Sequence, residues 1–193
     1  DGDRIICCDE KGKIIDGDKI LACLAQYFFY KSKSKSNAVV GTLMSNRGLE
    51  QFVNKIGLKF YRSNIGDKFV SELMKKKNCF LGGEQSGHII LKEFGFSGDA
   101  ILTALYLIKI ISKYNKKTSE IFDLYTSHFQ IQKNIKFKDS NVKKNKKINN
   151  LLRFYNNKIT DNARVLIRIS GTEPVIRLLV EGKKYSKIKL LSN

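Results

Sequence analysis

The chain has no hydrophobic run that approaches the ~20 residues needed to cross a bilayer, and no secretory leader is visible. These absences predict a cytoplasmic protein with no membrane among its partners. The 193 residues, 42% of them hydrophobic, can bury a core and form one large domain or two small ones.

Paired C-x-x-C cysteines are also missing. The four cysteines are Cys7, Cys8, Cys23 and Cys79, and the chain has two histidines. Structural zinc sites usually draw their ligands from such pairs, so the sequence does not favour a zinc site. Buried, reduced thiols are the preferred interpretation.

Acidic residues are scarce: 18 Asp and Glu stand against 36 Lys and Arg, which leaves a net charge of +18. Such a surface could attract nucleic acid, a membrane or a phosphorylated small molecule. The lysines are spread through KSKSKS, KKKN, YNKKTSE and NVKKNKKINN rather than gathered in one segment. This spread favours a solvated basic surface and no dedicated nucleic-acid partner.

Apolar strands alternate with helices through the first 114 residues, which predicts an α/β unit. Asp16 or Asp18 can cap the first helix, and the polar stretch 31–37 reads as a linker. The expected helices are 18–30, 49–56, 69–76 and 98–113; the expected strands are 4–8, 38–44, 58–62 and 78–83.

A smaller α+β unit is expected from His128 onward. Residues 129–137 alternate like a half-exposed strand, and residues 164–170 and 175–182 read as two strands joined by the tight turn GTEP. The last segment, YSKIKLLSN, is short for a closing helix.

The segment G-D-x-I-L occurs twice, at Gly17 and again at Gly98. The same offset carries Asp3 onto Glu84. A repeat that superposes two acidic loops as well as two helix starts suggests two copies of one unit.

Three loops carry chemistry, and the first is DGDR at the start of the chain. Asp1 and Asp3 flank a glycine and can turn their oxygens toward one hard cation. Two carboxylates supply only part of the roughly six oxygens that Mg²⁺ requires. An ordinary Asp- and Gly-rich turn is the alternative.

The second loop is GGEQSGHII. Glu84, Ser86 and His88 offer an acceptor, a hydroxyl and a titratable ring within five residues. Such a cluster suits a hydroxyl-rich ligand, because one carboxylate can accept hydrogen bonds from two sugar hydroxyls. The alternative is a turn network in which these side chains satisfy loop amides.

The third loop is RISGTEPVIR. Arg168, Ser170, the Gly171–Thr172 turn and Arg177 bring guanidinium groups, hydroxyls and backbone amides to one hairpin, which suits a phosphate. A surface hairpin with solvated arginines is the alternative. The chain has no G-x-x-x-x-G-K-[ST] segment, so this is not a nucleotide P-loop.

Taken in order, DGDR, GGEQSGH and R-x-SGTEP-x-x-R resemble the motifs of the α-D-phosphohexomutase family. The resemblance extends over nearly the whole chain through DGDKIL, VVGTLMSNRGLE and IGDKFV. It implies a four-domain fold of three α/β domains and a small α+β domain. In this chain it implies a remnant of the second domain (1–30), a complete third domain (38–120) and an α+β (TBP-like) C-terminal domain (128–193).

The resemblance also implies a reaction. These enzymes move a phosphoryl group between the 6- and 1-positions of a hexose phosphate through a bisphosphorylated sugar, with a phosphoserine as nucleophile. The second and third motifs are most similar to the glucosamine branch, whose product feeds UDP-N-acetylglucosamine and the cell wall. Mg²⁺ is held there by the phosphoserine and three aspartates of a D-x-D-x-D-R loop.

The family's site residues carry over by motif. The resemblance assigns metal binding to Asp1 and Asp3, catalytic support to Arg4 and His88, sugar contacts to Glu84, Ser86 and His88, and phosphate contacts to Arg168, Ser170, Gly171, Thr172 and Arg177.

The phosphoserine loop and the first aspartate have no counterpart in this sequence. The chain is therefore expected to be the sugar- and phosphate-recognition half, inactive unless a complementing N-terminal half is supplied. Two alternatives stay open: a glucose- or mannose-phosphate mutase half, against which Gln85 favours the amino sugar, and a non-enzymatic basic remnant.

Overall fold

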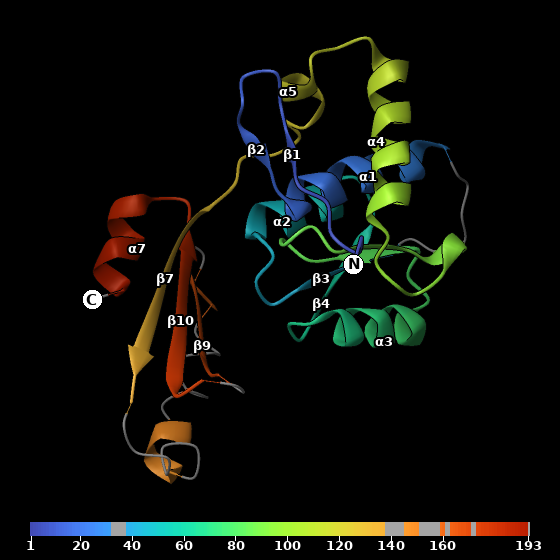
Figure 1. Cartoon of the computed structure of the whole chain (residues 1–193). Coiled ribbons are helices and arrows are strands. Elements are labelled where there is room, and N and C mark those ends of the chain that lie inside the picture. The colour runs from blue at the N-terminus through green and yellow to red at the C-terminus, as the bar shows by residue number, and fades with distance from the viewer. Residues whose placement is uncertain (32–37, 138–144, 151–158, 161–162, 171–172, 193) are drawn as a thin grey trace. The chain divides into compact units, whose positions relative to one another are not determined.

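The computed structural model describes residues 1–31, 38–137, 145–150, 159–160, 163–170 and 173–192, which form two compact units. Unit 1 is Asp1–Thr126 and unit 2 is Ser127–Asn193. Most of the expected linker, residues 32–37, lies outside the described residues. Figure 1 shows the elements of each unit.

Unit 1 is built on a four-stranded sheet in the order β4-β3-β5-β6. The central strand β3 is parallel to β4 and β5, and β6 is antiparallel to β5. Helices α2 and α3 make the crossovers that parallel neighbours require. The bounds are β3 (Ala38–Thr42), α2 (Arg47–Lys55), β4 (Lys59–Ser63), α3 (Asp67–Lys77), β5 (Leu81–Gly83) and β6 (Ile89–Leu91).

The sheet carries a hydrophobic core on each face, because successive side chains of a strand point to opposite sides. Val39 packs into the core formed with α1 (Gly17–Lys31), α2, α4 (Ala100–Tyr114) and α5 (Thr118–Ile121). Val40 packs into the second core, where Val70 and Met74 of α3 lie. The α/β class expected from the sequence is confirmed, as a sheet between two helical layers.

Helix α1 belongs to this sheet. Ile20, Leu21 and Leu24 have no exposed surface and share one core with Val39 of β3. Residues Asp1–Thr126 form one compact unit, and the expected division after residue 30 stays a prediction. The sequence suggested a boundary because the polar stretch after α1 resembles a linker, although α1 covers the sheet.

The first residues lead into a hairpin of β1 (Cys7–Cys8) and β2 (Ile14–Ile15). Asp9 holds its turn, since one carboxylate oxygen accepts hydrogen bonds from the amides of Lys11 and Lys13. The strand expected from Arg4 begins only at Cys7, and Arg4 itself forms an isolated β-bridge with His88. A short 3-10 helix, η1 (Lys92–Phe94), follows β6.

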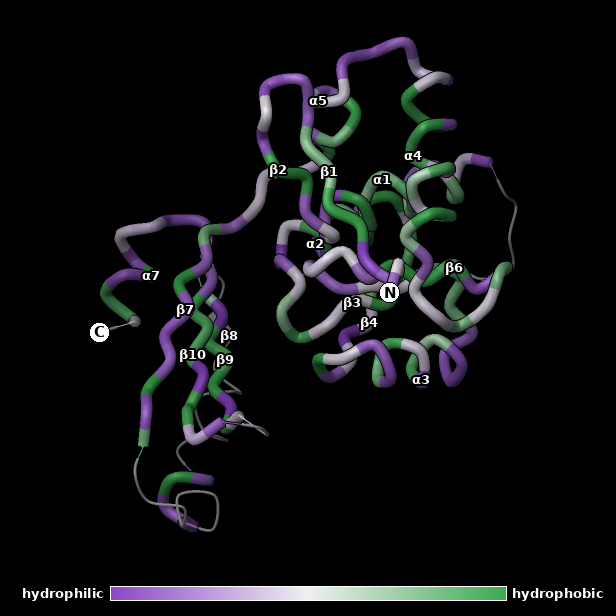
Figure 2. Tube along the Cα trace, viewed as in Figure 1, coloured by the Kyte–Doolittle hydropathy of each residue, from purple (hydrophilic) through white to green (hydrophobic). Residues whose placement is uncertain are grey.

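Unit 2 is an antiparallel sheet in the order β7-β10-β9-β8 with α7 packed against β10 and β7. The expected α+β unit is confirmed, and Figure 2 shows its strands alternating between hydrophobic and hydrophilic residues. The closing helix has only seven residues. The bounds are β7 (Phe129–Lys136), β8 (Ile159–Thr160), β9 (Ala163–Ile169), β10 (Val175–Gly182) and α7 (Tyr185–Leu191).

Candidate functional site

The EQSGH loop is the turn between β5 and β6. Glu84 and His88 close it, because the Glu84 amide donates to the His88 carbonyl at 2.9 Å and the Gly87 amide donates to the Glu84 carbonyl at 3.0 Å. Gly87 has a φ of +89°, a conformation that side chains disfavour. The turn geometry therefore requires glycine at this position.

The DGDR loop lies directly against this turn, although 79 residues lie between Arg4 and Glu84 in the sequence. The Ile5 amide donates to the Gly87 carbonyl at 3.1 Å, and the backbones of Arg4 and His88 form an isolated antiparallel β-bridge. A Cβ added to Gly87 would lie 2.0 Å from the Ile5 carbonyl oxygen, so a larger residue would separate the two loops. The fold thus brings together two of the three motifs.

Asp3 and His88 make the polar contact between these loops. The Asp3 Oδ2 lies 3.3 Å from the His88 Nδ1. The imidazole is only 3% exposed, and its ring packs on Gly98, where an added Cβ would lie 2.4 Å from the ring. A ring enclosed in this way is well placed to orient the Asp3 carboxylate.

Glu84 is also largely enclosed. Its side chain is 8% exposed, and Oε1 accepts a hydrogen bond from the amide of Gly66, the residue that precedes α3, at 2.9 Å. One carboxylate oxygen thus satisfies a loop amide, which is the turn-network role left open by the sequence. Ser86, by contrast, is exposed.

The start of α1 supports the same loop. The Gly17 amide donates to the Gln85 carbonyl at 3.0 Å, and the Gln85 side-chain amide lies 3.3 Å from an Asp16 carboxylate oxygen. A Cβ on Gly17 would lie 2.0 Å from the Glu84 carbonyl oxygen. Sequence reasoning did not include Asp16 and Gly17 in the site, although the G-D-x-I-L repeat marks them: both of its glycines, Gly17 and Gly98, pack against the EQSGH loop.

The two aspartates by themselves make an incomplete magnesium site. Asp1 is exposed, and the Asp3 carboxylate lies near both His88 and the Arg4 guanidinium, at 3.3 and 3.9 Å. Among the described residues, no group of three or more His, Cys, Asp or Glu side chains could hold a metal ion. The donor set is therefore of the right chemistry for Mg²⁺ but too small for its six oxygens.

In unit 2, the SGTEP hairpin places two arginines face to face. Arg168 of β9 and Arg177 of β10 are directly opposed in the antiparallel register. Partial burial lowers the pKa of Arg168, and the positive charge of Arg177 lowers it further. Arg177 also pairs with Glu173. Two guanidinium groups on one face of a hairpin are suited to an anion.

Ser170 has a structural contact at the same turn. It is 2% exposed, and its hydroxyl oxygen accepts a hydrogen bond from the Glu173 amide at 3.2 Å. Its own amide donates to the Val175 carbonyl at 2.8 Å. The other two expected phosphate-binding residues, Gly171 and Thr172, lie outside the described residues.

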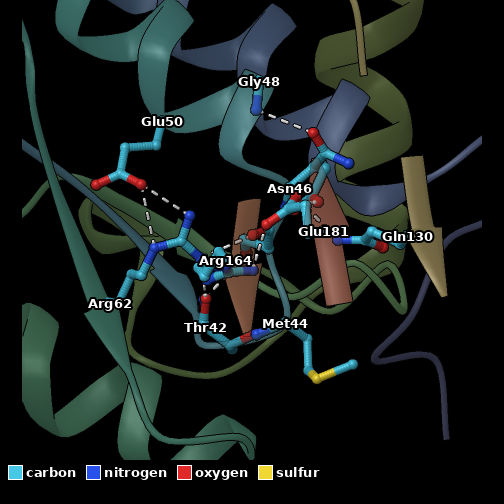
Figure 3. Close-up of polar contacts among 11 residues, drawn as sticks. Thr42, Met44, Asn46, Gly48, Glu50, Arg62, Gln130, Arg164 and Glu181 are labelled. Carbon is cyan, nitrogen blue, oxygen red and sulfur yellow. Dashed lines mark hydrogen bonds and ion pairs between the residues drawn. The ribbon is translucent and has the colours of Figure 1, made fainter. Parts of the chain in front are cut away.

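Arg62 fixes the loop that follows β3, a role that sequence reasoning missed. Its guanidinium donates to the carbonyls of Thr42 and Ser45, at 3.0 and 2.7 Å, and pairs with Glu50 at 2.9 Å (Figure 3). The ends of parallel strands commonly carry ligand-binding loops. The sequence signal for this role is an arginine in a strand (Arg62) that follows a helix with an acidic residue (Glu50).

The sequence indicates Asp18 only as a candidate helix cap, and the structure gives it a different role. Asp16 makes the cap, since its Oδ1 accepts from the Lys19 amide, whereas Asp18 is fully buried and its Oδ2 accepts from the Asn46 amide at 2.7 Å. Burial raises the pKa of Asp18 to about 7, although the Asn46 hydrogen bond opposes this shift.

Within the ranges that the structure describes, no helix is both long enough and apolar enough to span a bilayer.

Two family models match the chain. The model of the phosphoglucomutase/phosphomannomutase alpha/beta/alpha domain III matches residues 16–128, and that of the C-terminal domain matches residues 133–192. Phosphoglucosamine mutases of Pelagibacter ubique and Nautilia profundicola are 48% and 44% identical over 191 residues, 99% of this chain in each case. The chain spans only 42% and 43% of those two relatives.

Solved structures show the same fold. A phosphoglucomutase/phosphomannomutase family protein of Burkholderia thailandensis has a TM-score of 0.82 at 20% identity, covering 100% of this chain and 43% of that one. The Aspergillus fumigatus N-acetylphosphoglucosamine mutase, solved with GlcNAc-6P and magnesium, has a TM-score of 0.74 at 22% identity, covering 100% of this chain and 49% of that one. The chain thus belongs to the phosphoglucomutase/phosphomannomutase family, of which it contains domain III and the C-terminal domain.

Proposed function

We propose that the chain is the sugar- and phosphate-binding part of a phosphoglucosamine mutase, which interconverts glucosamine 6-phosphate and glucosamine 1-phosphate. The relatives with 44–48% identity carry that name. The observation that carries the proposal is the contact of Asp3 with His88, at 3.3 Å, because it joins the metal-loop motif to the sugar-loop motif.

Each loop would make a different kind of contact. The Ser86 hydroxyl and the second carboxylate oxygen of Glu84 would bind sugar hydroxyls, since Oε1 of Glu84 already accepts from the Gly66 amide. The Arg168 and Arg177 guanidinium groups would bind the phosphate that is not being transferred. Charge-assisted, bidentate hydrogen bonds make arginine suitable for this task.

Asp1 and Asp3 would supply two of the ligands of a magnesium ion, whose remaining ligands would come from outside this chain. When bound, Mg²⁺ would neutralise charge on the phosphoryl group. The chain's own contribution is to hold the Asp3 carboxylate, through the enclosed His88 ring and the neighbouring Arg4.

Activity should depend on the preceding part of the protein. We expect the isolated chain to form no glucosamine 1-phosphate from glucosamine 6-phosphate. Joined to the part of the Pelagibacter ubique relative that precedes the matched region, it should become active with Mg²⁺. Turnover by the purified isolated chain would contradict the proposal. So would an active joined protein that prefers glucose or mannose phosphates to glucosamine phosphates.

Ligand binding gives a second test that does not need turnover. Isothermal titration calorimetry of the joined protein should detect glucosamine 6-phosphate, and Arg168→Ala should weaken that binding by at least about tenfold, the effect of losing ~1.4 kcal/mol. Lys136→Ala is the matched control, because Lys136 is an exposed cation of the same sheet. Equal loss in both variants would indicate a general charge effect.

A further inference from the structure

Helix α4 is hydrophobic on two faces, and unit 1 covers only one of them. Leu107 and Ile110 are buried against the core, 3% and 1% exposed. On the other side, Ile101, Leu105 and Ile108 are 72%, 59% and 59% exposed. Their spacing places these three side chains, the outer stripe, along one face of the helix.

A helix that is hydrophobic all round is normally buried on all sides. Figure 2 shows hydrophobic residues along α4. The G-D-x-I-L repeat sharpens this contrast, because Ile20 and Leu24 of α1 occupy the positions that match Ile101 and Leu105. Those two residues of α1 are fully buried. Equivalent residues are thus covered in one helix and uncovered in the other.

The first residues of the chain lie at the beginning of this helix. The amide of Ala100, the first residue of α4, donates to the Gly2 carbonyl at 3.0 Å, and Figure 1 shows the N-terminus beside α4. In the longer relatives, the segment that precedes the counterpart of Gly2 therefore approaches the protein at the end of α4 from which the outer stripe starts.

The relatives contain enough additional polypeptide to cover this face. The matched region is 43% of the Nautilia profundicola relative. It consists of domain III followed by the C-terminal domain, so most of the remaining length precedes it. Exposed Lys109 and Lys113 lie on the same helix, which favours acidic residues on the partner at that end.

We propose that the outer stripe of α4 is the docking surface for the polypeptide that precedes domain III in the longer relatives, whether it is joined to this chain or separate. The partner surface is apolar where it meets Ile101, Leu105 and Ile108, and acidic where it meets Lys109 and Lys113. The inference rests on the proposed function only in that both require the preceding polypeptide.

Cysteine labelling tests the docking without measuring activity. Leu105→Cys is introduced together with Cys7→Ser and Cys8→Ser, which leaves Cys23 and Cys79 buried. We expect maleimide to modify residue 105 at least tenfold more slowly in the protein joined to the preceding part of the Pelagibacter ubique relative than in the isolated chain. The control is Leu190→Cys, a 79% exposed leucine of α7, whose rate should not change.

A variant that introduces negative charge into the outer stripe provides the second measurement. Ile101→Glu with Leu105→Glu should weaken binding of the separately produced preceding part by at least tenfold in calorimetry, while Leu190→Glu should not. Both replaced side chains are exposed, so the isolated variant should keep the thermal unfolding curve of the parent chain. If the unfolding curve of the variant changes, the labelling rates of residue 105 decide whether the outer stripe is the docking surface.

The outcomes separate the two proposals. Unchanged labelling of residue 105 in an active joined protein overturns the docking surface and leaves the function standing. Protection of residue 105 in an inactive joined protein supports docking and counts against the function. Protection that appears in the isolated chain and grows with its concentration assigns the face to a second copy and overturns the proposed partner.

Discussion

Arg168 and Arg177 are cross-strand partners, directly opposite each other on β9 and β10. Like charges in this position destabilise an antiparallel sheet by roughly 0.2–1 kcal/mol relative to a neutral pair. Partial burial and the neighbouring charge together lower the pKa of Arg168. Glu173 compensates only in part, because it pairs with Arg177 alone among the described residues. An anion bound between the two guanidinium groups would relieve the repulsion.

The first prediction concerns this pair. Arg177→Gln should leave the thermal stability of unit 2 unchanged or raise it slightly at low salt, since it removes the repulsion. It should also abolish stabilisation by inorganic phosphate, which for the parent chain is expected to approach ~2.7 kcal/mol at 100 times the dissociation constant. Thermal unfolding with and without phosphate measures both effects.

Lys136→Gln serves as the control for the first prediction, because it removes one exposed positive charge from the neighbouring strand. Phosphate should stabilise that variant as it does the parent chain. Loss of stability in Arg177→Gln without phosphate would instead indicate a purely structural role for Arg177.

A second prediction concerns the ring of His88. Gly98→Ala should destabilise unit 1 by about 1–3 kcal/mol, the usual cost of overpacking, because the added Cβ would lie 2.4 Å from the imidazole. Combining it with His88→Ser, which removes the ring, should cost less than the sum of the two single changes. A double-mutant cycle from denaturant unfolding measures the difference, and additive costs would contradict the contact.

The third prediction is a pH dependence caused by Asp18. Burial raises the folded-state pKa of this carboxyl to about 7 from the ordinary value of 3.8. Folding therefore favours the protonated form. The stability contributed by Asp18 is complete below pH ~4 and is lost as the pH rises toward 7. Asp18→Asn should flatten the profile of the unfolding free energy over this range.

Denaturant unfolding at pH 4, 5.5 and 7 measures this effect. Glu72→Gln is the control, because the Glu72 side chain is 57% exposed, and its removal should leave the profile in place. A profile for Asp18→Asn that follows the parent chain throughout would show that Asp18 does not gain a proton on folding.

The fourth prediction concerns the buried ion pair of unit 2. The Arg164 guanidinium lies 2.7 Å from the Glu181 carboxylate, with side chains 9% and 0% exposed, and the Gln130 amide donates to the same carboxylate at 3.1 Å (Figure 3). Arg164→Met should destabilise unit 2 by roughly 3–5 kcal/mol, because it leaves a buried carboxylate without its cation.

The double variant Arg164→Met with Glu181→Leu should recover most of this loss, since apolar residues of similar volume often replace a buried pair at little cost. Unfolding should be followed by a probe within unit 2, because two units need not unfold together. If the double variant is no more stable than Arg164→Met, the ion pair itself does not explain the cost.

Local pattern determined most of the secondary structure. The apolar run at 38–42 predicts a strand buried on both faces, and the periodic apolar residues predict helices buried along one stripe. These predictions need only the local order of apolar and polar residues. The RISGTEPVIR segment predicted its hairpin in the same way, and with it the meeting of Arg168 and Arg177, since partners across a short turn follow from register.

Only the tertiary structure decided what the enclosed polar residues do. Nothing adjacent to Asp18 in the sequence shows that it is buried beneath the Asn46 amide, and nothing near His88 shows that Asp3 is its partner. Such roles depend on contacts between segments distant in sequence. The sequence by itself determined the family motifs and the strand and helix pattern. Packing decided which polar atoms are enclosed, because burial, and the pKa and hydrogen bonding that follow from it, depends on all neighbours in space.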